Sequence, residues 1–178
     1  TTARKIWEGL GSESIQLYSM QWLKILRPTQ FALSMATRKS VFAPVATLAK
    51  PFSFVTDRSL TAIPNSPFRL KGSNLHAEEL SVHQLLDAIG RFSSRFALKP
   101  EYTEQSLAWL IRKAEEKKEH GPLRKIALFT SEKKMLGWYM YYPNSNNLGH
   151  VLQIGAEKRT IDAVLTHLFN DARQHGSL

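Results

Sequence analysis

The segment that decides the fold covers residues 123–176, where three short apolar stretches precede a helical pattern. They read LRKIALFT at 123–130, MLGWYMYY at 135–142 and HVLQIGA at 150–156. Two turn-rich stretches separate them, SEKK at 131–134 and PNSNNLG at 143–149. Aromatic and branched residues favour strands, and Pro, Asn, Ser and Gly favour turns. The segment therefore predicts three antiparallel strands joined by hairpins.

Helices are expected on both sides of these strands in the sequence. After the third strand, apolar residues recur at helical spacing at Ile161, Val164, Leu165, Leu168 and Ala172. Upstream, Ser81 and Gln84 form a capping-box motif, and Leu80 and Leu85 are spaced for a hydrophobic staple. Thr103 is expected to cap a second helix. Residues 68–71 are expected to form a short, weakly marked strand.

One core is expected beneath these helices, because amphipathic helices bury their apolar stripes against a sheet. The aromatic strand should bury one face and leave the other exposed or facing a ligand. The residues expected to be buried together are Leu85, Ile89, Leu107, Leu110, Ile111, Val164 and Leu168.

The first 66 residues are expected to form a separate, partly helical segment or linker before a domain at 67–178. Apolar residues from Phe31 to Leu48 lie near helical spacing between Pro28 and Pro51. Such a stripe either packs on its own domain, which is the favoured interpretation, or lies on a membrane surface, because Arg38, Lys39 and Lys50 flank it.

Composition narrows the classes of function. The chain has 178 residues, a formal charge of +9 and no cysteine, which excludes disulfides, thiolate metal sites and a cysteine nucleophile. The absence of cysteine fits a cytoplasmic location.

No apolar run is long enough to span a bilayer. The basic residues are scattered, which favours a solvated surface over attraction for anionic ligands, and no nucleic-acid partner is expected.

Common catalytic motifs are absent from the sequence. The six histidines lack paired ligand spacing, so no metal site is expected. Nucleophile-elbow, phosphate-loop and dinucleotide motifs do not occur.

The order helix, helix, three strands, helix resembles the GNAT superfamily of N-acetyltransferases. The resemblance covers about residues 68–176 and rests on GWYMYY at 137–142, VLQI at 151–154 and VLTHLFNDA at 164–172. It is nearest to bacterial GNAT-like proteins in which a Gly-Trp-Tyr-x-Tyr-Tyr strand precedes a Val-Leu-Gln strand. The expected fold class is therefore α+β, a GNAT-like mixed or antiparallel sheet with packed helices behind a partly helical N-terminal segment.

The resemblance implies an acyl-CoA-dependent N-acyltransferase that moves an acetyl group from acetyl-CoA, bound as a substrate, to an unknown amine. The pantetheine arm would lie beside the third strand and the pyrophosphate at the start of the next helix. The residues that this implies are Gln153, Ile154, Gly155, Ala156, Lys158, Arg159, Thr160 and Ile161. His150 and Tyr141 are the candidate catalytic residues, because a base must reach the amine; for each, a structural role is the competing interpretation.

The chain departs from the family pattern in two ways. The glycines of the family's phosphate loop fall on Thr160 and Asp162 here, and the Asp162 carboxylate would repel a phosphate. The family's next strand and helix, which often supply a catalytic tyrosine, do not follow before Leu178. The domain is therefore expected to be either truncated or catalytically degenerate, and a non-catalytic GNAT-like binding or regulatory module is the alternative function.

Overall fold

An antiparallel four-stranded sheet organises the described part of the chain. The computed structural model describes residues 2–11, 21–37, 56, 72, 75–94, 97–145 and 147–178. The strands are β1 (His76–Glu79), β2 (Arg124–Phe129), β3 (Met135–Ser145) and β4 (Leu148–Ala156), in the spatial order β1-β2-β3-β4. Every neighbouring pair is antiparallel, so the predicted α+β class with an antiparallel sheet is confirmed.

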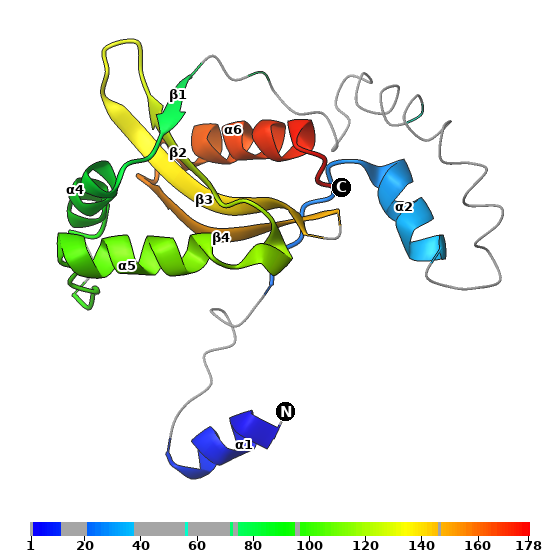
Figure 1. Ribbon diagram of the computed structural model, residues 1–178, viewed down its shortest axis with the longest axis horizontal. Coiled ribbons are helices and arrows are strands. Elements are labelled where there is room, and N and C mark those ends of the chain that lie inside the picture. Colours follow the sequence, from blue (N-terminus) through cyan, green and yellow to red (C-terminus); the bar gives the residue numbers. More distant parts are fainter. Residues whose placement is uncertain are drawn as a thin grey trace.

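The helices cover both faces of the sheet, as Figure 1 shows. Helices α4 (Val82–Phe92) and α5 (Glu104–Glu115) lie on one face, and α6 (Ile161–Gln174) lies on the other. A 3-10 helix, η3 (Lys118–His120), leads from α5 to β2. The N-terminal part contributes α1 (Thr2–Gly9) and α2 (Pro28–Thr37).

The predicted helix starts are confirmed at two positions. Ser81 caps α4, accepting from the Gln84 amide at 3.2 Å while its own amide donates to Gln84 Oε1 at 2.9 Å. Leu80 and Leu85 are both buried in the same cluster, as the staple requires. Thr103 caps α5. These local bonds satisfy amides that a helix start leaves without an intrahelical partner.

The prediction of one shared core is wrong, because the sheet separates two clusters. One contains Leu85, Leu107 and Ile111 with Trp138 and Met140, beneath α4 and α5. The other contains Val164 and Leu168 with Tyr139 and Tyr141, beneath α6. Leu110 is 41% exposed.

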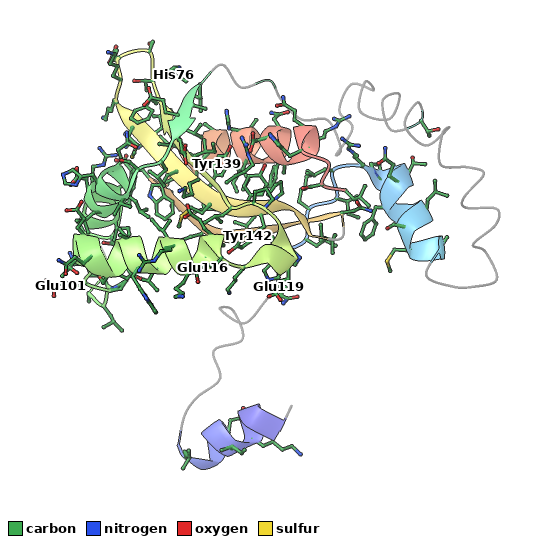
Figure 2. All side chains as sticks on the ribbon, in the orientation of Figure 1. His76, Glu101, Glu116, Glu119, Tyr139 and Tyr142 are labelled. Atoms are coloured by element: carbon green, nitrogen blue, oxygen red, sulfur yellow. The ribbon has the colours of Figure 1, made fainter. Side chains whose placement is uncertain are left out.

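Both faces of β3 are buried, so the expectation of an exposed row on this strand is wrong, while the alternative of a row facing a ligand stays a prediction. Trp138 and Met140 belong to the cluster beneath α4 and α5, whereas Tyr139 and Tyr141 alternate with them into the cluster beneath α6. Figure 2 shows Tyr139 beside α6 and Tyr142 toward the end of α5. An interior strand with helices on both faces buries its aromatic residues in both directions.

The N-terminal segment reaches the sheet domain through Leu26 and Arg27. Leu26 is buried in the cluster beneath α6, and Arg27 Nη2 donates to the Arg173 carbonyl at 2.7 Å. Helix α2 covers the start of the expected stripe at 31–48, and the packing of that stripe stays a prediction. The remainder of the stripe and the expected strand at 68–71 lie outside the described residues.

Candidate functional site

A cavity of about 610 Å³ lies at the carboxyl end of β4. Its walls come from the end of α4, the irregular segment 98–102, β3, β4 and the start of α6. Six of the eight residues expected to bind a cofactor line it: Gln153, Ile154, Gly155, Ala156, Lys158 and Ile161.

Among the described residues, β4 is an edge strand of the sheet beside this cavity. It is the last strand in the order of the described sheet, and its hydrogen-bonded neighbour is β3. A strand at an edge presents a row of N–H and C=O groups away from its neighbour. Extended ligands that carry amide groups can pair with such a row.

A β-bulge interrupts β4 just before the cavity. Met140 is opposite Gln153, but the next residue, Tyr141, is opposite Val151, so Leu152 is an extra residue without a partner in the register. Bulges of this kind redirect side chains and often occur beside active sites. Here the bulge brings Gln153 and Gly155 to the same face of the sheet as Trp138 and Met140.

Trp138 presents a buried donor without a partner in the wall of the cavity. The side chain is 2% exposed, and its Nε1 is buried without a hydrogen-bond partner among the described residues. A Cβ atom added to Gly155 would lie 2.3 Å from this nitrogen, so the indole packs directly on the glycine backbone. A buried donor without an acceptor costs about 1–3 kcal/mol, which makes this position a candidate contact for a ligand oxygen.

The start of α6 differs from an open phosphate site. The Glu157 carbonyl accepts from the amides of both Thr160 and Ile161, at 3.0 Å each. The Thr160 hydroxyl donates to the Leu136 carbonyl at 2.9 Å. These two amides are therefore bonded within the protein, and Arg159 and Thr160 are outside the residues that line the cavity. Lys158, next to the start of α6, and Lys99, in the segment 98–102, are cations in its wall.

The two candidate catalytic residues are not brought together. His150 is opposite Tyr142, is exposed, and its ring centre lies 5.6 Å from that of His120. Tyr141 is fully buried on the opposite face, where its hydroxyl donates to Asp171 Oδ2 at 2.6 Å. Burial, reinforced by this bond, raises the pKa of Tyr141 far above its ordinary value. Neither residue lines the cavity.

Sequence reasoning missed the polar network around Asp171. Arg124 donates to both carboxylate oxygens from Nε and Nη2 at 2.9 Å, and Tyr139 Oη lies 2.8 Å from His167 Nδ1. Burial alone would raise the pKa of Asp171, but the bonds from Arg124 and Tyr141 outweigh it and lower the pKa. The missed signal was an aspartate three residues after Leu168, on the apolar face of a predicted helix. The network joins α6 to the sheet.

Two further features bear on the class of site. The described residues contain no cluster of three or more His, Cys, Asp or Glu side chains that could hold a metal ion. Within the part of the chain that the structure describes, none of the helices has the length and apolar character that crossing a bilayer requires.

Comparison of the chain with protein-family models, with curated proteins and with solved structures gives no match.

Proposed function

We propose that the domain is an acyl-CoA-dependent N-acyltransferase that binds the acyl-CoA in the cavity beside residues 153–156. The observation that carries this proposal is the unpartnered Trp138 N–H in the cavity wall. A carbonyl oxygen is the acceptor that such a donor needs, and acyl-pantetheine chains carry carbonyl groups in their thioester and amides. The element order α4, α5, β2, β3, β4, α6, which the GNAT resemblance leads one to expect, also supports it.

In this proposal β4, Trp138 and Gly155 have separate roles in holding the ligand. The exposed edge of β4 supplies backbone donors and acceptors along the pantetheine arm. Trp138 orients a carbonyl oxygen, and Gly155 leaves room for the indole. Because Nε1 is closed to solvent, the wall around it must open for a ligand oxygen to reach it. A bound acyl-CoA would supply an activated acyl group as a thioester.

Phosphate recognition is proposed to rest on side-chain charge. The amides of Thr160 and Ile161 are already bonded, and Asp162 adds a negative charge in the first turn of α6. Lys158 in the wall and the neighbouring Arg159 would offset that charge. Affinity for a coenzyme A phosphate should therefore fall as salt is added, since exposed charges are screened.

A non-catalytic binding module is the second candidate, and a specific observation favours it. His150 lies outside the cavity lining, and the Tyr141 hydroxyl is buried and bonded to Asp171. No base is thus assigned beside the proposed acyl group. Under this alternative, acetyl-CoA binds at the same place without turnover.

The test uses the indole N–H signals of ¹⁵N-labelled protein. Trp138→Phe identifies the Trp138 signal, and Trp109→Phe, which alters a half-exposed residue on α5, is the matched control. Acetyl-CoA should move the Trp138 signal, and Trp138→Phe should weaken binding about fivefold to tenfold, the worth of one hydrogen bond. Coenzyme A without the acetyl group separates the two sources of oxygen, because only a thioester contact requires that group.

The results separate the proposals. Absence of binding at millimolar acetyl-CoA would refute both. Binding that leaves the Trp138 signal unmoved would remove Trp138 from the site. Binding with release of coenzyme A in the presence of amines supports the transferase, and binding without release under any amine supports the module.

A further inference from the structure

A second cavity, of about 330 Å³, adjoins the first on the same face of the sheet. The two cavities share Tyr102 and Gln153 in their walls. The wall of the second cavity is mainly apolar and comes from α5, β3 and β4: Leu107, Leu110, Ile111, Met140, Tyr142 and Leu152.

Two apolar side chains in this wall are unusually exposed. Leu110 is 41% exposed and Leu152 is 49% exposed. Leu152 is the extra residue of the β4 bulge. Apolar atoms that line an open hollow gain free energy when a ligand removes them from water. The cavity is therefore suited to a ligand with an apolar body.

The rim of the cavity carries two lysines with different surroundings. Lys113 Nζ lies 2.6 Å from Glu116 Oε2. Lys117 is exposed, and its ammonium has no ion-pair partner in the part of the chain that the structure describes. The cation available to an incoming anionic group is therefore Lys117.

We propose that this second cavity holds the acceptor of the acyl transfer, a small primary amine with an apolar body and a carboxylate that pairs with Lys117. The proposal rests on the function proposed above. The amine would lie at the junction of the cavities, where the Tyr102 hydroxyl and the Gln153 amide oxygen can accept its hydrogens. The acyl group would meet it from the first cavity.

This arrangement accounts for every atom of the transfer. The amine nitrogen attacks the thioester carbonyl carbon, so that a C–N bond forms as the C–S bond breaks. The proton that the nitrogen releases ends on the departing sulfur. One amine and one acyl thioester thus give one amide and one thiol.

The experiment measures binding by calorimetry, so that it does not depend on turnover. The probes are phenylalanine, phenethylamine, which lacks the carboxylate, and acetyl-CoA. Lys117→Gln should weaken phenylalanine binding about threefold to fivefold, the worth of an exposed ion pair, and should leave phenethylamine and acetyl-CoA binding unchanged. Lys134→Gln, the same change on the β2–β3 turn, is the control. Leu110→Asp, which places a carboxylate in the apolar wall, should weaken phenylalanine binding further.

Three results would overturn the inference. Phenylalanine could fail to bind at millimolar concentration, or could bind equally well to wild type and Lys117→Gln. Failure of acetyl-CoA to bind, with phenylalanine binding intact, would refute the acyl-transfer proposal and with it the acceptor role. Binding of both probes with the expected effect of Lys117→Gln would support the inference.

Discussion

Gly155→Ala tests the contact that shapes the first cavity. The added Cβ would lie 2.3 Å from Trp138 Nε1, 2.4 Å from Cε2 and 2.8 Å from Cζ2. Three atoms of a rigid, buried ring cannot all withdraw by a simple rotation, so the indole or β4 must move. Overpacking of this kind lowers the free energy of unfolding by about 1–3 kcal/mol. Urea denaturation measures this change directly.

Gly90→Ala is the matched control, because it adds the same methyl group where space is open. No atom lies within 4 Å of the Cβ that Gly90 would gain, and the residue is exposed within α4. Alanine should raise the free energy of unfolding there by about 0.5–1 kcal/mol, because glycine loses more freedom in a helix. The two substitutions should thus change the free energy of unfolding in opposite directions.

A double-mutant cycle ties the cost to the indole. In a Trp138→Leu background the ring atoms are gone, so Gly155→Ala should cost much less than in wild type. An equal cost in both backgrounds would show that the strain arises elsewhere. A Gly155→Ala protein as stable as wild type would refute the close packing of the indole on β4.

Three other predictions concern the two cores and the network beneath α6. Leu107→Ala should lower the free energy of unfolding by about 2–5 kcal/mol, as for a buried leucine, whereas Leu110→Ala should cost under about 1 kcal/mol; equal effects in urea would contradict the packing of α5. Asp171→Asn should cost about 2–3 kcal/mol, because Arg124 loses its charged partner; a stability equal to wild type would exclude this role. Burial lowers the pKa of His167. The stability that neutral His167 gives the folded protein is therefore complete above the ordinary histidine pKa of about 6.5 and is lost as the pH falls below it. His167→Gln should make the free energy of unfolding decline less steeply as the pH falls below about 6.5.

Local sequence signals predicted the elements well. The Ser81 and Thr103 caps, the three strands after residue 122 and the helix from Ile161 depend on near neighbours in the chain, which a sequence displays directly. Strand β1 was missed because its residues, HAEE, are all exposed and lack apolar alternation. It is held at the edge of the sheet by backbone pairing with β2, which leaves no side-chain pattern.

Longer-range arrangement was harder to predict. The apolar stripe that includes Leu107 shows that α5 buries one side, and the stripe that includes Val164 shows the same for α6. Neither stripe shows which face of the sheet its helix covers. The sequence predicted a ligand site at the junction of β4 with α6, and a cavity lies there; binding of a ligand at this place stays a prediction. The separation of His150 from Tyr141 was not, because these residues belong to different strands and their faces depend on the register between β3 and β4.

The β4 bulge also changes which residues of the strand share a face of the sheet. Counting along the sequence in twos from His150 reaches Leu152 and then Ile154, yet Gln153 and Gly155 share the face of His150 after the bulge. Removing Leu152 would leave Val151 opposite Tyr141 and Gln153 opposite Met140, so both halves would keep their faces. A chain lacking Leu152 should therefore retain its sheet while losing one wall of the second cavity. A one-residue insertion elsewhere in β4 would move the side chains of half of the strand to the opposite face of the sheet.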